Sequence, residues 1–249
     1  MSDLQGKVAL ITGSARGIGK AIAERFGELG ASVIVNYSAS EQPARETVAA
    51  IERLGTSAIA VQADVGKVAE IERLFATAIE RFGHLDIVVV NAGVELVDFP
   101  MLNVAEADFD RLFGVNAKGA FFTLQHAAKH VVDQGRIIYV GSSTTAFPTP
   151  GHGLYGGSKL APQFFVEVLA KEIGARGVTV NSILPSAIEG AGVSADKVRP
   201  EVLEFVRQFH PIQRMGTPID VADAAEFLAG NQASFISGQH LLLSGGGPA

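Results

Sequence analysis

The sequence predicts an α/β fold in which a doubly wound parallel sheet of seven strands is covered by helices on both faces. Short apolar runs alternate with stretches of helical periodicity along the chain, and each link is long enough for a crossover connection. The run LDIVVVN at residues 85–91 is also apolar enough to be buried on both faces, as strands of parallel sheets are. Since no linker or repeat divides the 249 residues, we expect one domain, residues 1–249.

The first half of the chain predicts four strands and the helices between them. A strand at residues 7–12 (KVALIT) ends at Gly13, and the next helix places apolar residues on one face: Ile18, Ala21, Ile22, Phe26 and Leu29. Strands follow at residues 32–35 and 57–62, separated by a helix that carries Val48, Ile51 and Leu54. The fourth strand, residues 85–91, comes after an amphipathic helix that ends at Gly83.

The second half predicts three more strands and one long irregular segment. A helix at residues 106–131 precedes a strand at 136–140, and a helix after Tyr155 precedes a strand at 178–184. A helix from Pro218 and a strand at 239–243 complete the series. Residues 186–215 interrupt the alternation, with a short helical pattern after Pro200. Because long insertions beyond strand ends often cover sites, we predict a substrate lid there; the alternatives are a structural excursion or a subunit contact.

Charge and composition exclude several classes of function. The net charge of −6 disfavours nucleic acid or an anionic membrane surface as a partner. The absence of cysteine excludes disulfides, iron–sulfur clusters and thiol nucleophiles, and the six histidines show no metal-binding spacing, so we predict no metal. No apolar run approaches the roughly 18 residues that span a bilayer, so we expect a soluble, cytoplasmic chain. Charged residues are only 18% of the chain, which favours a surface hidden against another subunit.

A glycine-rich turn joins the first strand to the first helix. In the segment TGSARGIG, residues 12–19, backbone N–H groups and the positive end of a helix converge on one point, which suits a pyrophosphate. Glycine allows the tight turn and the close approach of the ligand, and Gly19 allows close packing of helix on sheet. The alternative, a plain strand-to-helix turn, is less consistent with this position in a βαβ unit.

Three polar residues predict acid–base chemistry on a carbonyl group. Tyr155 and Lys159 are four residues apart, so on a helix they share a face. An ammonium beside a phenol is expected to lower the phenol pKa, which would make Tyr155 a general acid or base. Ser142 or Ser143 follows the carboxyl end of a central strand, where a hydroxyl could polarise a carbonyl.

Five motifs in this order resemble the short-chain dehydrogenase/reductase family across essentially the whole chain. They are TGSARGIG, Asn91-Ala92-Gly93, Asn116, Ser142 and Tyr155-x-x-x-Lys159. The resemblance implies a Rossmann-type fold, an NAD(P)-dependent oxidoreductase and a homotetramer. It also selects Ser142, which stands thirteen positions before Tyr155. In the same way it implies that Asn116 distorts its helix and holds a water that relays protons to Lys159.

The resemblance further implies which residues bind the cofactor. Asp64 and Val65 would contact the adenine, although Asp64 equally suits a turn or helix cap. After the sixth strand the chain departs from the family pattern, because Gly190 stands where a threonine usually contacts the nicotinamide; Ser186 or Ser194 would have to replace that contact. The residues expected at the cofactor are Gly13, Ser14, Arg16, Gly17, Ile18, Gly19, Tyr37, Ser38, Asp64, Val65, Asn91, Ala92, Gly93, Tyr155, Lys159, Pro185, Ser186 and Ile188.

The end of the second strand predicts the choice of cofactor. NAD-dependent relatives usually place an acid there to hold the ribose hydroxyls, and an acid would repel a 2′-phosphate. This chain has Tyr37 and Ser38 instead, and Arg16 in the glycine loop carries a charge that suits phosphate. We therefore expect NADPH to be preferred over NADH.

Together these patterns predict a carbonyl reductase in which Tyr155 donates a proton to a small hydrophobic ketone, such as an aryl ketone or a 3-oxoester. The neighbourhood of the site is apolar, with Val94, Leu96, Phe147 and Leu154. Within the family, the segment HPIQRMGTP at residues 210–218 resembles 3-oxoacyl-carrier-protein reductases and hydroxynaphthalene reductases. The alternatives are a 3-oxoacyl-carrier-protein reductase, an NAD-dependent alcohol or sugar dehydrogenase, and a nucleotide-binding regulator without catalysis.

Overall fold

Seven parallel strands form one sheet in the order β3-β2-β1-β4-β5-β6-β7, as predicted for a doubly wound fold. The computed structural model describes residues 3–192 and 200–247. The strands are β1 (Val8–Ile11), β2 (Ser32–Tyr37), β3 (Ala58–Gln62), β4 (Leu85–Val90), β5 (Val131–Val140), β6 (Thr179–Pro185) and β7 (His240–Leu243). Side chains of β1, β4 and β6 are buried throughout, because helices cover both faces of the sheet.

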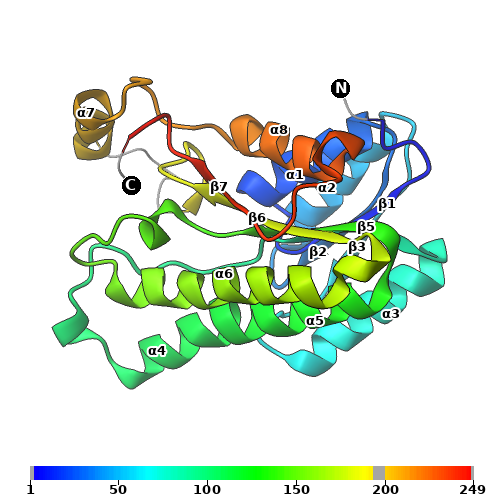
Figure 1. The fold of residues 1–249 in the computed structure, drawn as a ribbon, viewed down its shortest axis with the longest axis horizontal. Helices are drawn as coiled ribbons and strands as arrows, with labels where there is room; N and C mark the ends of the chain where they lie inside the picture. The colour runs from blue at the N-terminus through cyan, green and yellow to red at the C-terminus, as the bar shows by residue number, and fades with distance from the viewer. Residues whose placement is uncertain (1–2, 193–199, 248–249) are drawn as a thin grey trace.

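Two layers of helices enclose the sheet, as Figure 1 shows. One layer contains α1 (Gly17–Glu28), α2 (Glu41–Glu52) and α8 (Pro218–Ala229), whose apolar side chains share one buried cluster. The opposite layer contains α3 (Val68–Phe82), α5 (Ala120–His130) and α6 (Gly153–Ile173), which share a second cluster. Helix α4 (Glu106–Phe113) precedes α5, and α7 (Pro200–Phe209) lies in the segment between β6 and α8. None of the helices in the described ranges is both long enough and apolar enough to cross a membrane.

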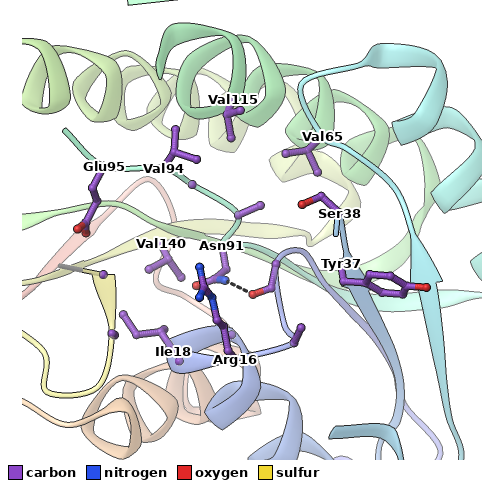
Figure 2. A pocket seen from close by; sticks show the side chains of 18 of the residues that line it. Arg16, Ile18, Tyr37, Ser38, Val65, Asn91, Val94, Glu95, Val115 and Val140 are labelled. Atoms are coloured by element: carbon purple, nitrogen blue, oxygen red, sulfur yellow. Dashed lines mark hydrogen bonds between the residues drawn. The ribbon is translucent and has the colours of Figure 1, made fainter. Parts of the chain in front are cut away.

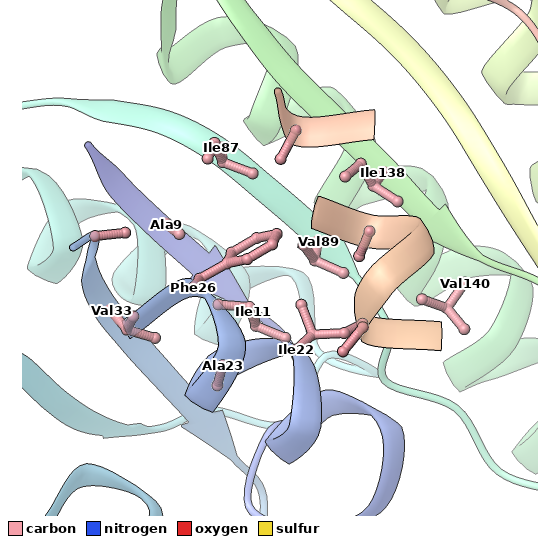
Figure 3. Close-up of a cluster of buried hydrophobic side chains, with 14 of the residues drawn as sticks. Ala9, Ile11, Ile22, Ala23, Phe26, Val33, Ile87, Val89, Ile138 and Val140 are labelled. Atoms are coloured by element: carbon pink, nitrogen blue, oxygen red, sulfur yellow. The ribbon is translucent and has the colours of Figure 1, made fainter. Parts of the chain in front are cut away.

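The packing of α1 on the sheet fixes the glycine-rich turn in place. Ile22 and Phe26 are fully buried and pack against the β1 side chains Ala9 and Ile11 and against Val89 of β4 (Figure 3). Burial of one such large side chain stabilises the fold by about 1.5–3 kcal/mol. The N-terminus of α1 is therefore held at the carboxyl edge of the sheet, between the ends of β1 and β4.

Two elements differ from their predicted form. The single helix expected at residues 106–131 is divided by a π-helical segment, Gly114–Gly119, which contains Asn116 and confirms the distortion expected at that residue. Strand β5 begins at Val131 rather than at residue 136, with a register shift opposite Leu85 and Ile87 and a positive φ at Gln134. Strands are predicted where apolar residues follow one another, and the polar residues Asp133 and Gln134 interrupt such a run here. The start of β5 was therefore missed.

Candidate active site

A cavity of about 650 Å³ lies at the carboxyl ends of β1, β2 and β4, where parallel sheets bind ligands (Figure 2). The register of the sheet brings these ends together, because Ile11 is paired with both Val35 and Val89. Fourteen of the residues predicted from the sequence line this cavity: Gly13, Arg16, Gly17, Ile18, Gly19, Tyr37, Ser38, Asp64, Val65, Asn91, Ala92, Gly93, Tyr155 and Lys159.

The glycine turn forms the floor of the cavity because larger residues would not fit there. A Cβ at Gly13 would lie 2.9 Å from Cα of Ala92, and a Cβ at Gly19 would lie 2.5 Å from the carbonyl oxygen of Gly13. The first turn of α1 carries no acidic residue, and its N-cap residue, Arg16, makes no side-chain cap hydrogen bond. The first N–H groups of α1 are thus left for an anionic group, so the residues present fit the pyrophosphate of a dinucleotide.

Asn36 connects the glycine turn to two strands. Its Oδ1 accepts a hydrogen bond from the backbone N–H of Gly13 at 3.0 Å, and its Nδ2 donates to the carbonyl oxygen of Ala63 at 3.0 Å. Asn91 adds a second link, since its Nδ2 donates to the carbonyl oxygens of Thr12 and Gly13 at 2.9 and 3.1 Å (Figure 2). Both amide side chains hold the turn in its binding shape.

Ser14 lies below this floor and outside the cavity. Its hydroxyl donates to the carbonyl oxygen of Ile11 at 2.8 Å and accepts from the backbone N–H of Asn36 at 3.1 Å. Ser14 is fully buried, so its side chain shapes the turn. Asp64 also has the turn role that the sequence allowed, because its Oδ1 accepts from the backbone N–H of Gly66 at 2.9 Å.

The first turns of α6 place Tyr155 and Lys159 on the cavity wall. Both side chains are buried, and Nζ of Lys159 donates to the carbonyl oxygen of Val140 at 3.1 Å. Ser142 follows β5, and its Oγ accepts hydrogen bonds from the backbone N–H and the hydroxyl of Thr144 at 3.3 and 2.9 Å. A side-chain interaction with Ser142 also lowers the pKa of the Tyr155 hydroxyl, which places Ser142 next to Tyr155.

Asn116 does not line the cavity but connects two segments that do. Its Oδ1 accepts from the backbone N–H of Val94 at 2.8 Å, and its Nδ2 donates to the carbonyl oxygen of Val94 at 2.8 Å and to Oγ of Ser158 at 3.0 Å. The side chain is buried and bridges the segment after β4 to helix α6. The proton-relay water implied for Asn116 stays a prediction.

The pKa of the Tyr155 hydroxyl is shifted in the direction opposite to the one that the neighbouring Lys159 predicts. Burial raises the pKa of the Tyr155 hydroxyl above its ordinary value, and the negative charge of Glu95 raises it further, against the smaller lowering effect of Ser142. Burial lowers the pKa of Lys159 to about 8. In this state the phenol is therefore held protonated, as a proton donor requires.

Glu95 is the site residue that the sequence reading missed. It lines the cavity, and the Tyr155 hydroxyl donates to Oε1 of Glu95 at 3.5 Å. The sequence could have indicated Glu95, because it is a charged residue within the apolar stretch Val94-Glu95-Leu96-Val97, two residues after Gly93. Charged residues are rare in such stretches unless they have a partner or a function.

The residues after β6 are placed differently from the expectation. Pro185 ends β6, Ile188 is buried in the core, and Ser186 lines a separate cavity of about 150 Å³. The large cavity is lined instead by Gly190, Ala191 and Gly192. Ser194 and the central part of the predicted lid, residues 193–199, lie outside the described residues.

The histidine pair of α5 is packed against an aromatic ring. The rings of His126 and His130 stack at 5.9 Å, and both lie against Phe75 of α3. In the part of the chain that the structure describes, we find no group of three or more His, Cys, Asp or Glu residues arranged to hold a metal ion.

Comparison with known proteins defines the family. Residues 13–247 match the family model described as "Enoyl-(Acyl carrier protein) reductase". The chain is 41% identical to a hydroxynaphthalene reductase-like protein, Arp2, of Metarhizium acridum, and the match covers 98% of this chain and 96% of that protein. The chain belongs to the short-chain dehydrogenase/reductase family, whose members are NAD(P)-dependent oxidoreductases acting on CH–OH and C=O groups.

Solved structures agree with this assignment. A short-chain dehydrogenase of Burkholderia cenocepacia in complex with NADP has a TM-score of 0.91 and 36% identity, covering 99% of each chain. The promiscuous reductase LugOII, which catalyses keto-reduction at C1 during lugdunomycin biosynthesis, has a TM-score of 0.91 and 39% identity, covering 98% of this chain and 99% of that one. The Rossmann-like fold is thus shared over the full length.

Proposed function

We propose that this protein is an NADPH-dependent carbonyl reductase that acts on a small hydrophobic ketone. The observation that carries the proposal is the buried Tyr155 residue, which lines a cavity that fits a dinucleotide and whose pKa is raised by burial. When bound, the reduced nicotinamide supplies a hydride to the carbonyl carbon. Tyr155 donates its proton to the carbonyl oxygen, so the ketone becomes an alcohol and the resulting phenolate takes a proton from solvent.

The other site residues support this proton transfer. The Ser142 hydroxyl stabilises the negative charge that develops on the carbonyl oxygen. Lys159 stabilises the Tyr155 phenolate once the proton has left. Asn116 fixes the position of Val94 relative to helix α6 through its hydrogen bonds to Val94 and Ser158. Apolar side chains around Tyr155 favour a hydrophobic substrate: Val94, Leu96, Val97, Val104, Leu112, Phe113 and Leu154.

Arg16 supports the preference for NADPH. It is exposed beside the cavity, and it forms no ion pair with any residue in the described ranges, so its charge is left for a 2′-phosphate. Ser38 and Ser40 line the same end of the cavity, and no acid stands at the end of β2. Two structural relatives from Burkholderia cenocepacia hold NADP, which agrees with this reading. We further propose that residues 186–215 cover the substrate and that the enzyme is a homotetramer.

Initial rates test the proposed function. We expect oxidation of NADPH in the presence of acetophenone or ethyl acetoacetate, and a Tyr155→Phe variant should lose at least about 100-fold in kcat while it still binds NADPH. Full activity of Tyr155→Phe would contradict the mechanism. Turnover only with NAD and alcohols would favour the NAD-dependent dehydrogenase, and turnover only with carrier-bound 3-oxoacyl groups would favour the carrier-protein reductase.

The cofactor preference has its own matched pair of variants. Arg16→Ala should raise KM for NADPH by about 10-fold or more and leave KM for NADH nearly unchanged, because only NADPH carries the 2′-phosphate. Lys20→Ala removes a similar charge one turn further along α1, where Lys20 pairs with Glu24 at 3.7 Å, and should change neither constant. Equal effects of the two substitutions would contradict a specific phosphate contact.

A further inference from the structure

A carboxylate stands beside the proton donor of this site. Oε1 of Glu95 lies 3.5 Å from Oη of Tyr155. A carbonyl oxygen that takes the Tyr155 proton must come within about 2.7 Å of Oη, so it cannot lie much more than about 6 Å from the Glu95 carboxylate. Substituents on the carbon next to the carbonyl are thus within reach of Glu95.

The position of Glu95 in the cavity separates it from the cofactor end. Figure 2 shows Glu95 on the opposite side of the cavity from Tyr37 and Ser38. Among the residues that the structure describes, the cavity wall carries one other acid, Asp64, which is held in its own turn by Gly66. Glu95 is therefore the acid at the substrate end.

The surroundings hold the Glu95 side chain in place. The adjacent residues Val94, Leu96 and Val97 pack into the apolar cluster that contains Tyr155. On the other side, a Cβ at Gly192 would lie 2.4 Å from Oε1 of Glu95, so the backbone near Gly192 approaches the carboxylate as closely as only glycine allows. A single acid in an apolar wall is the arrangement by which pockets fix the orientation of a ligand.

Lys159 is a cation of this cavity that acts on Glu95, because the negative charge of the carboxylate raises the pKa of Lys159 against the larger lowering effect of burial. Lys159 donates to the carbonyl oxygen of Val140 at 3.1 Å. Arg111 lies 3.8 Å from Asp108. A negative group on the carbon next to the carbonyl would lie near the Glu95 carboxylate, which repels it.

We propose that Glu95 selects the substrate: it accepts a hydrogen bond from a hydroxyl group next to the ketone, and it excludes ketones that carry a carboxylate there. This inference rests on the proposed carbonyl reductase function. Among hydrophobic ketones, it predicts a preference for neutral ketones that carry a hydroxyl group next to the carbonyl, and it excludes 2-oxo acids.

Two pairs of ketones measure the two parts of the proposal. Benzoylformate and its methyl ester differ in charge, and 2-hydroxyacetophenone and 2-methoxyacetophenone differ in a hydrogen-bond donor. Two like charges about 6 Å apart at the edge of a protein correspond to roughly a 100-fold effect, so we expect Glu95→Gln to raise kcat/KM for benzoylformate relative to its ester by at least about 10-fold. Glu95→Leu should remove the preference for the hydroxyl-bearing ketone, which Glu95→Gln should partly keep because its amide oxygen still accepts a hydrogen bond.

Asp98→Asn is the matched control. Asp98 is an exposed acid three residues further along the same segment and does not line the cavity, and asparagine tolerates the positive φ of 56° found there. The control should leave both ratios within about twofold of the wild-type values. An unchanged benzoylformate ratio in Glu95→Gln, or an equal change in Asp98→Asn, would overturn the proposal.

Calorimetry separates this inference from the proposed function. Binding of benzoylformate and its methyl ester is measured to the NADP⁺ complexes of the wild-type protein and of Glu95→Gln. If no ketone is turned over, the proposed function fails, and the calorimetric ratio still decides whether Glu95 excludes anions. If ketones are turned over but neither ratio responds to Glu95, the function stands and the role of Glu95 is wrong.

Discussion

Lys159 illustrates how a residue that serves the reaction can weaken the fold. Its side chain is buried and its Nζ donates to the carbonyl oxygen of Val140, so the charged form is poorly solvated and the pKa falls to about 8. The unfolded chain, in which the lysine pKa is near 10.4, therefore binds more protons between pH 8 and 10. Stability consequently rises with pH in this window.

This linkage predicts the behaviour of Lys159→Met. The variant lacks the buried charge, so it should be more stable than the wild type at pH 7, and its advantage should shrink by about 2 kcal/mol between pH 7 and 9.5. This pH window ends at about pH 10, the ordinary pKa of a tyrosine in the unfolded chain. Above it the unfolded chain loses the Tyr155 proton that the folded protein keeps, so stability then falls as the pH rises. Chemical denaturation at several pH values measures the difference; parallel curves for the two proteins would contradict it.

At the scale of one residue, the sequence predicted which side chains line the site better than it predicted their pKa values. The spacing of Tyr155 and Lys159 correctly placed both on one cavity wall, since four residues are about one helical turn. The sign of the pKa shift at Tyr155 was missed, because it depends on burial and on Glu95, which is sixty positions away in the chain. Likewise, Ser14 was predicted to bind the cofactor, but its hydroxyl is hydrogen-bonded to the backbone of Ile11 and Asn36. These contacts depend on the fold and cannot be seen in the sequence.

At the scale of elements, helix α8 has the best-defined beginning. The hydroxyl of Thr217 accepts from the backbone N–H of Asp220 at 3.3 Å, and the Asp220 carboxylate accepts from the backbone N–H of Thr217 at 2.7 Å. Arg214 and this capping box lower the pKa of Asp220. The contribution of the carboxylate is therefore present at neutral pH and is lost as the solution becomes acidic, below the ordinary pKa of an aspartate.

Removal of this cap should destabilise the protein. Thr217→Ala should reduce the free energy of unfolding by about 1 kcal/mol, because the backbone N–H and the carboxylate of Asp220 both lose the Thr217 hydroxyl as a hydrogen-bond partner. Ser40→Ala is the control: Ser40 occupies the same position before α2 but makes no side-chain cap hydrogen bond, so its loss should have a much smaller effect. Equal changes in the denaturation midpoints of the two variants would contradict the assignment.

Strands were easier to predict than helix interruptions. Completely buried strands such as β4 appear in sequence as continuous apolar runs, so their bounds agree with the structure within one or two residues. The π-helical segment Gly114–Gly119 has no such pattern, and its position was expected only through the family resemblance of Asn116. The irregular start of β5 was missed for a related reason, since a strand that bends at Gln134 loses its apolar alternation.

At the scale of the molecule, one layer of helices leaves large apolar side chains exposed. Phe164 and Leu160 of α6 are 63% and 52% exposed, and Phe109 of α4 and Phe121 of α5 are also exposed. The helices α4, α5 and α6 lie on the same side of the sheet (Figure 1). The sequence predicted a surface hidden against another subunit from the low charged fraction. Phe165 and Leu169 of α6, by contrast, pack against the core of their own chain.

The exposed apolar face of α6 predicts that a charged residue introduced there would dissociate the proposed tetramer. Phe164→Glu should convert the tetramer into smaller species, because a glutamate at the centre of an apolar interface would be buried without a partner. Leu54→Glu changes a similarly exposed side chain, 49% accessible at the end of α2, and should leave the assembly intact. Sedimentation velocity distinguishes the two; a monomeric wild-type protein would contradict the proposed assembly.

The π-helical segment also bears on which changes in chain length the protein tolerates. A π turn holds one residue more than an α turn, so a deletion within Gly114–Gly119 would give a regular helix and rotate everything after it by about 100° relative to α4. Asn116 would turn away from Val94, and the apolar stripe of α5 would turn out of the core. A length change that most helices absorb at their ends would here break the link by which Asn116 joins Val94 to helix α6, which carries Tyr155 and Lys159. The number of residues in this one turn is therefore set by the site that it supports.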